Sequence, residues 1–427
     1  MKKIYTLLAG FLLLASSLIV NAQCAGLRYH DYVFPMNPTL TSNVTYGSNV
    51  KVGGTTQTLL MDVYEPTGDV SASRALVIVA HGGSFIGGSK TGSDVVPLCK
   101  DLAKLGYVAV SMEYRIGMTN FPFPGPDSAD ATESVMRAVH DGRAAVRYFR
   151  KNARVGGNTY KIDTNNIFFA GVSAGGFIGL HMAYLDQLSE YPTYIDTLGQ
   201  PGLLGGVEGI SGNQGYPSEV KAVVNICGAL GDTAWIKPGD EPVLSFHGTN
   251  DNTVPYGSAI IVLSGFYPLL EVDGSASIKV QVDNKGIENC FVSWAGQDHV
   301  PEVSSAAYYD STITITRNFL EHYTCGVPLN CNYTSAPVVA SVNDISSDAE
   351  FNIYPNPTYN SATIDLSAFK GKELNLELYD AMGRKAKSIN MIKTDSYILE
   401  RDNLPSGIYF MNVNVDGKIF SKKIIFE

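Results

Sequence analysis

One serine in this chain has neighbours that suit a nucleophile. Residues 171–175 read Gly-Val-Ser-Ala-Gly, with Ser173 at the centre. The four residues before this run are apolar and suit a buried strand, whereas the segment after it is apolar all round as far as Leu185, like a core helix. A sharp strand-to-helix turn strains its central residue, and flanking glycines leave room for it. The pattern predicts a serine nucleophile at a helix N-terminus; the alternative is an ordinary glycine-rich turn.

A second glycine-rich run, His-Gly-Gly at residues 81–83, follows the apolar strand candidate 75–80. Nucleophilic attack on an acyl carbon creates an oxyanion, which needs backbone N–H donors aimed at it, and residues without side chains let the main chain approach closely. We expect Gly82 and Gly83 to supply donors, together with Ala174, the residue after the serine. An ordinary glycine turn is again the alternative.

A general base has to come from the seven histidines. Hydrolases built on such a turn carry the nucleophile, the acid and the histidine in that chain order, which leaves His299 and His322. His322 lies in a helix end and is expected at the surface. His299 follows a strand candidate that ends at Trp294, in a polar loop that can return to Ser173. His181 is eight residues past Ser173 on one helix, which places it about 12 Å away.

The acid that orients this base is predicted to be Asp251. The strand candidate 242–246 is followed by a polar loop that contains Asp251. A carboxylate at that place orients the imidazole and stabilises its charged form. Asp298 is the competitor, but residues adjacent in sequence rarely aim their side chains at each other.

Strand-like and helix-like runs alternate from about residue 40 to residue 323, which predicts an α/β fold with a mostly parallel sheet flanked by helices. A helix is expected within residues 130–153, where apolar residues recur at helical spacing. A short connection between residues 227 and 242 leaves no room for a cap, so we expect an open site, with the Gly- and Pro-rich stretch 189–219 along one wall. The strand candidates are the runs 59–64, 75–80, 108–112, 167–171, 220–226, 242–246 and 290–294.

The two ends of the chain differ from this central part. Two lysines, an apolar run and small residues before Gln23 predict a signal peptide over residues 1–22, because the apolar run is shorter than the roughly 20 residues of a bilayer span. The catalytic domain is expected over residues 23–326, followed by a linker over residues 327–350. Residues 351–427 read as short alternating strands without His or Cys, which predicts a small all-β sandwich.

Composition excludes several partners. A net charge of −10 and a pI near 5.2 argue against nucleic acid, and no integral membrane segment is expected in the mature chain. Six cysteines in an exported chain permit disulfides. Cys325 and Cys331 flank a short loop and are the expected pair, whereas Cys99 and Cys227 are expected to be buried free thiols. No spacing of His and Cys indicates a metal site, and we expect no cofactor.

Together the motifs of residues 40–323 resemble the α/β-hydrolase carboxylesterases and lipases. The resemblance implies an α/β-hydrolase fold with Ser173 as nucleophile and with Asp251 and His299 as its partners. One departure is Ser84, which stands where hormone-sensitive-lipase-like members often carry a third glycine, so the choice between Gly82 and Gly83 as main donor to the oxyanion stays open. The motifs are Ser-Ala-Gly-Gly at 173–176, His-Gly-Gly at 81–83, Ala-Val-Ser-Met-Glu-Tyr-Arg at 109–115 and His-Gly-Thr-Asn-Asp-Asn-Thr-Val-Pro-Tyr at 247–256.

The C-terminal part resembles the type IX secretion sorting domain of Bacteroidetes. This resemblance implies the type IX secretion machinery as a partner, export across both membranes to the surface or medium, and usually removal of the domain. The alternative is a carbohydrate-binding or spacer sandwich. The motifs are Phe-Asn-Ile-Tyr-Pro-Asn-Pro at 351–357, Leu-Tyr-Asp-Ala-Met-Gly-Arg at 378–384, Leu-Pro-Ser-Gly-Ile-Tyr-Phe at 404–410 and Lys-Lys-Ile-Ile-Phe at 422–426.

We therefore expect a secreted serine carboxylic-ester hydrolase that forms an acyl-enzyme with a small-molecule or polysaccharide-linked ester. One alternative is a prolyl-oligopeptidase-like serine peptidase, which shares the triad. Such enzymes normally carry a large propeller or cap, and the stretch before His81 is short. The other alternative is a non-catalytic surface adhesin on a hydrolase scaffold.

Overall fold

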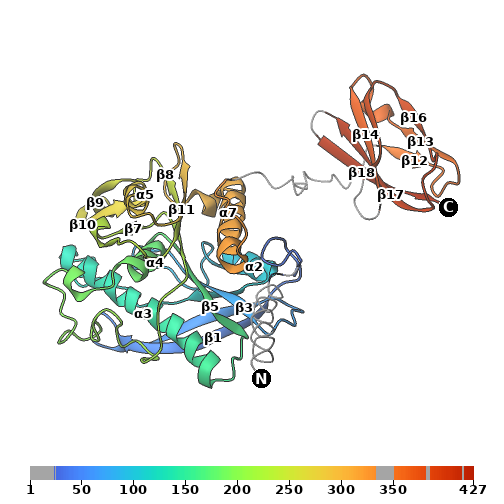
Figure 1. The fold of residues 1–427 in the computed structure, drawn as a ribbon. Helices are drawn as coiled ribbons and strands as arrows, with labels where there is room; N and C mark the ends of the chain where they lie inside the picture. The colour runs from blue at the N-terminus through green and yellow to red at the C-terminus, as the bar shows by residue number, and fades with distance from the viewer. Residues whose placement is uncertain (1–23, 25, 333–350, 381–384, 416–417) are drawn as a thin grey trace, which may run out of the picture. The chain divides into compact units, whose positions relative to one another are not determined.

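A twisted eight-stranded sheet forms the centre of the larger part of the chain (Figure 1). The computed structural model describes residues 24, 26–332, 351–380, 385–415 and 418–427, which form two compact units that divide between Thr334 and Ser335. The predicted signal peptide and residues 333–350 of the predicted linker lie outside the described residues.

The strand order of the sheet is β1-β2-β4-β3-β5-β6-β8-β11, so β3 and β4 are exchanged relative to the sequence order, and β3 lies between β4 and β5. The pairs β1–β2 and β2–β4 are antiparallel, and all the other pairs are parallel. This mostly parallel sheet confirms the predicted α/β fold class. The strands are β1 (Thr39–Val50), β2 (Thr56–Glu65), β3 (Arg74–Ala80), β4 (Val108–Met112), β5 (Ile162–Val172), β6 (Val223–Ile226), β8 (Val243–Gly248) and β11 (Asn289–Trp294).

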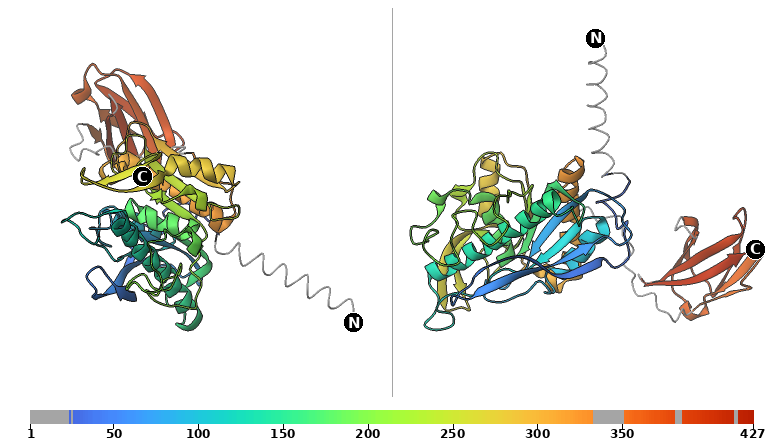
Figure 2. Two further views of the ribbon diagram at one scale, coloured as in Figure 1. Left: turned by 90° about the vertical axis from the view of Figure 1, so that its left-hand side faces the viewer. Right: turned by 90° about the horizontal axis from the view of Figure 1, so that it is seen from below.

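Both faces of the sheet are covered, which explains why its central strands are apolar without alternation. Every residue of β3 is buried. Leu76 and Ile78 belong to one hydrophobic core, whereas Val77 and Val79 belong to the other, because successive side chains of a strand point to opposite faces. Residues of α3, α4 and α5 line the first core and residues of α2 and α7 line the second (Figures 1 and 2).

The longest helix, α3, has a clear start signal. Asp127 Oδ1 accepts the N–H groups of Ala129 and Asp130, and the Asp130 carboxylate accepts the N–H of Asp127 in return. The helix predicted within residues 130–153 is confirmed. The helices of this unit are α2 (Val96–Leu105), α3 (Ser128–Val155), α4 (Ala174–Tyr184), α5 (Ser275–Asn284), α6 (Pro301–Ser304) and α7 (Ala306–Cys325), with short 3-10 turns η1 (Leu188–Glu190) and η2 (Thr233–Trp235).

A small antiparallel sheet was not predicted. Its order is β7 (Ala229–Leu230), β10 (Tyr267–Gly274), β9 (Ser258–Leu263). The hairpin β9–β10 follows β8 in the chain and precedes α5. The expectation of an open site rested on the short connection between residues 227 and 242. The hairpin lies further along the chain, so that connection gave no sign of it.

The predicted disulfide between Cys325 and Cys331 is wrong. Cys24 is bonded to Cys325, and Cys290 is bonded to Cys331. The reason is tertiary proximity: the Cα atoms of these pairs lie 5.6 and 5.3 Å apart, within the range a disulfide needs. The buried free thiols Cys99 and Cys227 are confirmed.

The smaller unit consists of two antiparallel sheets around its own hydrophobic core, which confirms the predicted all-β class. In the part of the chain that the structure describes, no helix combines the length and hydrophobicity needed to cross a bilayer. The first sheet has the order β12 (Asn352–Tyr354), β13 (Ser361–Asp365), β16 (Ser396–Glu400), and the second has the order β15 (Lys385–Ile392), β14 (Leu374–Asp380), β17 (Gly407–Val415), β18 (Lys418–Phe426); a 3-10 turn, η3 (Ser367–Phe369), follows β13.

Candidate active site

Ser173 stands on the sharp turn between β5 and α4. Its backbone has φ 53° and ψ −115°, a strained conformation for a residue with a side chain. The turn is possible because of its glycines: a Cβ on Gly171 would lie 2.0 Å from the Gly175 carbonyl oxygen, and a Cβ on Gly175 would lie 2.0 Å from Ala80 O. The Ser173 N–H donates to Ile226 O at 2.7 Å, which ties the turn to β6.

The structure brings the three sequence-predicted residues into one hydrogen-bonded chain. His299 Nε2 lies 2.8 Å from Ser173 Oγ, and His299 Nδ1 lies 2.7 Å from Asp251 Oδ2. Asp251 follows β8 and His299 follows β11, which are parallel neighbours, so both loops leave the same edge of the sheet. This hydrogen-bonded series of side chains has the geometry needed to remove a proton from Ser173.

The Asp251 carboxylate is completely buried and well supplied with donors. Its Oδ1 accepts the N–H groups of Thr253 and Val254 at 2.9 and 2.8 Å, and His247 Nε2 lies 3.3 Å from Oδ2. Burial would raise the pKa of Asp251, but hydrogen bonds from His247 and His299 outweigh burial and hold the pKa well below its usual range. The carboxylate is therefore ionised at neutral pH.

The competing residues lie elsewhere. Asp298 Oδ1 accepts the backbone N–H groups of Asn252 and His299 at 2.9 and 2.8 Å, so it ties the two loops together rather than binding the imidazole. His322 pairs with Glu288 at 3.0 Å. His181 is buried in α4, where its Nδ1 lies 2.8 Å from Phe177 O. Neither histidine is joined to Ser173.

Of the two loop glycines expected to donate to an oxyanion, Gly82 already has an acceptor for its N–H group. The Gly82 N–H donates to Asp94 Oδ2 at 2.7 Å, and sequence spacing gave no signal for this acid. Among the residues that the structure describes, the N–H groups of Gly83 and Ala174 have no acceptor. Gly83 has φ 122°, and a Cβ there would lie 2.3 Å from Gly87 O, so no other residue fits the loop.

His81 anchors this loop. The side chain is fully buried, and its ring stacks on Tyr114 with the ring centres 4.3 Å apart. Its Nδ1 lies 2.6 Å from Gly82 O, and its Nε2 lies 3.6 Å from Glu113 Oε2. Glu113 also accepts the Lys90 N–H at 3.1 Å. One carboxylate therefore contacts both His81, at the start of the loop, and Lys90, further along it. These contacts position the glycine-rich loop, and none of them joins His81 to Ser173.

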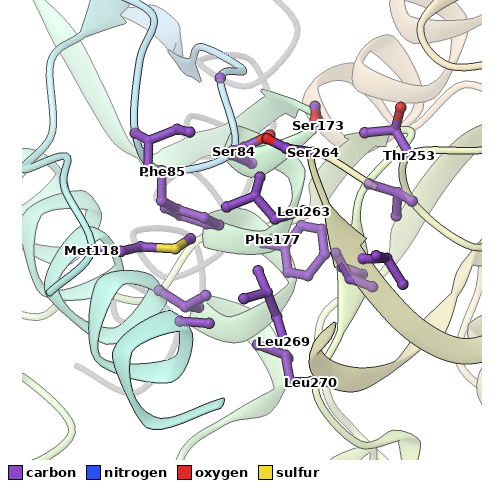
Figure 3. A pocket seen from close by; sticks show the side chains of 18 of the residues that line it. Ser84, Phe85, Met118, Ser173, Phe177, Thr253, Leu263, Ser264, Leu269 and Leu270 are labelled. Carbon is purple, nitrogen blue, oxygen red and sulfur yellow. The ribbon is translucent and has the colours of Figure 1, made fainter. Parts of the chain in front are cut away.

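Two hollows meet at Ser173. The apolar cavity, of about 650 Å³, is lined by residues of α3, α4 and the β9–β10 hairpin; Phe85, Met118, Phe177 and Leu269 are among them (Figure 3). The second hollow, of about 640 Å³, also has Ser173 in its lining, and we call it the cleft. His299 lines the cleft but not the cavity. The cleft is lined by Gly82, Gly83, Ser84, Gly88, Ser89, Gly92, Asp94, Val172, Ser173, Thr253, His299, Val300 and Val303.

The hairpin changes the expected shape of the site. Residues 261–265 and Leu269 and Leu270 form one side of the apolar cavity, where the sequence predicted an open site. The stretch 189–219 does not line this cavity among the described residues. It is held to α3 instead, where Arg147 donates to the Glu208 carboxylate at 2.7 Å.

One group of side chains in the described parts of the chain has the donor atoms for a metal ion. Cys227, Asp251 and His299 each offer an atom, and the three atoms lie within 4.8 Å of one another. Burial raises the pKa of the Cys227 thiol far above its usual value, so the sulfur keeps its proton. The Asp251–His299 pair is already joined by a hydrogen bond, as proton transfer requires.

Comparison with known proteins identifies two families along the chain. The BD-FAE family profile matches residues 61–231, and the profile described as secretion system C-terminal sorting domain matches residues 352–427. The first match includes Ser173 and the glycine-rich loop and ends before Asp251 and His299. No curated protein sequence matches the chain significantly.

Among solved structures, a truncated carbohydrate esterase from gut microbiota is 20% identical, with a TM-score of 0.46, and the match covers 67% of this chain and 97% of that chain. Native esterase 2 of the planctomycete Thermogutta terrifontis is 20% identical, with a TM-score of 0.45 and coverage of 68% and 94%. Its butyrate-bound form is 20% identical with a TM-score of 0.46 and coverage of 71% and 100%. The chain joins a BD-FAE esterase domain of the α/β-hydrolase class to a secretion system C-terminal sorting domain, which directs it to the outside of the outer membrane.

Proposed function

We propose that Ser173 is the nucleophile of this esterase, with His299 as general base and Asp251 as the acid that orients it. The observation that carries the proposal is the continuous hydrogen-bond chain between the three side chains, at 2.8 and 2.7 Å. Beside it lie the N–H groups of Gly83 and Ala174, which have no acceptor among the described residues. His299 Nε2 accepts the Ser173 proton as Oγ attacks the ester carbon. Gly83 and Ala174 donate to the oxyanion that forms.

The intermediate then collapses to an acyl-enzyme. His299 returns the proton to the leaving alcohol, and the ester bond to that alcohol breaks. A water molecule gives a proton to His299 and attacks the acyl carbon, after which the acid leaves and Ser173 recovers its proton. Asp251 stabilises the imidazolium at each of these stages.

The position of His299 supports our assignment of one hollow to the alcohol and the other to the acyl group. The leaving oxygen has to lie beside His299 Nε2 to receive its proton, and of the two hollows His299 lines only the cleft. We therefore place the alcohol in the cleft and the acyl group in the apolar cavity, whose lining includes Phe85 and Phe177. The cavity volume of about 650 Å³ is within the range of small-molecule sites and suits a bulky apolar acyl group.

The chemistry of the cleft points to an alcohol with several hydroxyl groups. Ser89, Asp94 and Thr253 line it and offer both acceptors and donors. Such groups recognise sugar hydroxyls and leave a simple alkyl alcohol without partners. We assign the natural substrate as an acyl decoration of a polysaccharide or its fragments, and the partner of residues 351–427 as the type IX secretion machinery.

The test compares kcat/KM for two esters of one apolar acid, a methyl ester and a sugar ester, and includes an organophosphonate label. We expect the sugar ester to be preferred and Ser173 to carry the label. Labelling of another residue would exclude Ser173 as nucleophile, and a preference for the methyl ester would exclude the polyol assignment. Cleavage of peptides in preference to both esters would support the peptidase alternative.

A further inference from the structure

A second chamber lies behind the apolar cavity. Its volume is about 120 Å³, and it is lined by residues of α3, α4, β10 and η2 and by Tyr191 and Tyr194. Three side chains line both spaces: Val135 of α3, Phe177 of α4 and Leu270 of β10. We call these three residues the partition. Because the same side chains line both spaces, the wall between the two spaces is one side chain thick at these positions.

Phe177 is the central member of the partition. It lies four residues after Ser173 in α4, about 6 Å along the helix axis, and only 4% of it is exposed. Its ring meets that of Phe85 edge-on on the cavity side, with the ring centres 6.1 Å apart. On the chamber side it lies nearly parallel to the His181 ring, also at 6.1 Å. An acyl chain that leaves Ser173 along α4 therefore meets this ring after one helical turn (Figure 3).

The chamber suits an uncharged chain. His181 donates its Nδ1 proton to Phe177 O, and burial lowers the pKa of His181 to about 4, so the imidazole is neutral. Trp235 packs against His181 with the ring centres 5.6 Å apart. The more exposed lining residues, Tyr194 and Glu271, mark the solvent side. The volume has room for about four groups of water or methylene size.

We propose that the partition sets how far an acyl chain extends along α4, and that the chamber behind it is a latent binding site for the distal part of an alkyl acyl chain. This inference rests on the proposed function in one respect, the placement of the acyl group in the apolar cavity. Shortening a partition side chain joins the two spaces and lets the chain pass.

Two partition variants test the proposal, Phe177→Leu and Leu270→Ala, which lie on different elements. The measurement is the ratio of kcat/KM for decanoyl and butanoyl esters of one alcohol. Burying about two further methylene groups raises this ratio about tenfold. Matched controls are Phe85→Leu and Met118→Ala, because both residues line the cavity and neither lines the chamber. In the controls we expect a change below about threefold.

A third variant fills the chamber. Thr132 lines the chamber but not the cavity. Adding Thr132→Phe to Phe177→Leu should return the ratio toward the wild-type value, whereas a gain that persists would overturn the proposal. An equal gain in the Phe85 and Met118 controls, or no gain in either partition variant, would also overturn it. If Phe177→Leu fails to fold, the ratio measured for Leu270→Ala decides between these outcomes.

Binding of free decanoate and butanoate separates this proposal from the catalytic one. Calorimetry in a Ser173→Ala background needs no chemistry, and the preference for decanoate should rise about tenfold on Leu270→Ala. A rise there supports the chamber even if no ester is hydrolysed, an outcome that would reject only the proposed function. An unchanged preference rejects the chamber even if esters are hydrolysed.

Discussion

Asp251 combines two roles that its loop makes compatible. Oδ1 is occupied by two backbone N–H groups of its own turn, which fixes the side chain, and Oδ2 faces His299 at 2.7 Å. His247 adds a further contact at 3.3 Å, and its Nδ1 is held 2.8 Å from Ser275 Oγ. A carboxylate so fixed orients the imidazole at little further entropic cost when substrate binds. In the proposed mechanism, the acid is thus preorganised before any ester enters.

We expect Ser173→Ala and His299→Ala each to remove nearly all esterase activity, because nucleophile and base act as a unit. Removing either member of such a unit lowers kcat by several powers of ten. The check is kcat/KM on an activated ester, with the melting temperature measured for both variants. His322→Ala is the matched control; loss of activity there with retention in His299→Ala would reject His299 as the base.

Asp251→Asn should weaken catalysis more than Asp298→Asn, by at least about tenfold. An amide in place of Asp251 can donate to Nδ1, which favours the tautomer with its proton on Nε2, and His299 can then no longer accept the Ser173 proton. Asp298 only accepts two backbone N–H groups, so its amide variant changes loop geometry in a solvated position. The measurement is kcat/KM of both variants on one activated ester. Equal losses would mean that Asp251 has been wrongly assigned as the acid.

Glu302 predicts a pH dependence of stability. It is 4% exposed, and neither carboxyl oxygen has a hydrogen-bond partner among the described residues. Burial, with the nearby charges of Asp94 and Asp251, raises the pKa of Glu302 from 4.5 to about 7. The unfolded chain therefore loses this proton at lower pH than the folded chain, so the group removes stability as pH rises from about 4.5 to about 7.

Glu302→Gln, which cannot ionise, should exceed the wild type in melting temperature at pH 8 but not at pH 4.5. The difference in the free energy of unfolding is roughly 2–3 kcal/mol at pH 8. Glu271→Gln, a change at an exposed glutamate of β10, is the control and should show no such trend. A difference that stays constant from pH 4.5 to pH 8 would show that packing rather than ionisation distinguishes the variant.

At the residue scale, the sequence predicted those site residues that short motifs or their order along the chain identify. Ser173 lies in a turn whose glycines are adjacent in sequence, and Asp251 and His299 each follow a strand in the chain order of such enzymes. Asp94 had no such signal. Its contact with Gly82 depends on the path of the loop between them, in which Ser84 and Phe85 take positive φ values, and no spacing rule predicts that path.

At the scale of elements, burial decided what could be predicted. The seven predicted strands are mostly apolar runs, and each lies within or overlaps one strand of the central sheet. The runs in β3, β4 and β5 are buried throughout. The hairpin β9–β10 instead lies at the surface, and its apolar residues Ile260 and Val262 are 57% and 46% exposed. The order of apolar and polar residues in this hairpin therefore does not show which face of a strand is buried and which is exposed. The missed hairpin supplies one side of the apolar cavity, so the shape of the site could not be predicted from the sequence.

The disulfides give a prediction at the scale of elements. Peptide mapping without reduction should recover Cys24 linked to Cys325 and Cys290 linked to Cys331, with Cys99 and Cys227 unlinked. The first bond ties the N-terminal segment to the end of α7 across 301 residues of sequence. Its removal in a Cys24→Ser variant should lower the free energy of unfolding by roughly 2–5 kcal/mol. A peptide linking Cys325 to Cys331 would contradict this pairing.

At the scale of the whole molecule, the two units have separate cores. The hydrolase unit is built around the two cores on either side of its sheet, whereas the sorting domain has a third core made only of its own residues. All the residues assigned to catalysis, and both hollows beside Ser173, belong to the larger unit. We therefore expect the chemistry to need nothing from residues 351–427, and the sorting domain to direct export independently.

Deleting residues 351–427 should leave an active esterase when the chain is exported to a foreign periplasm, with kcat/KM on a small soluble ester within about twofold of the full-length protein. The physical reason is that no core of the larger unit includes a residue of the smaller one. In the native host the same deletion should prevent delivery to the cell surface, because the sorting domain is then missing. The two measurements are hydrolysis by the purified proteins and the fraction of enzyme accessible on intact cells. Loss of hydrolysis in the purified truncated protein would make the domain part of the catalytic unit, and undiminished surface delivery would show that export relies on another part of the chain.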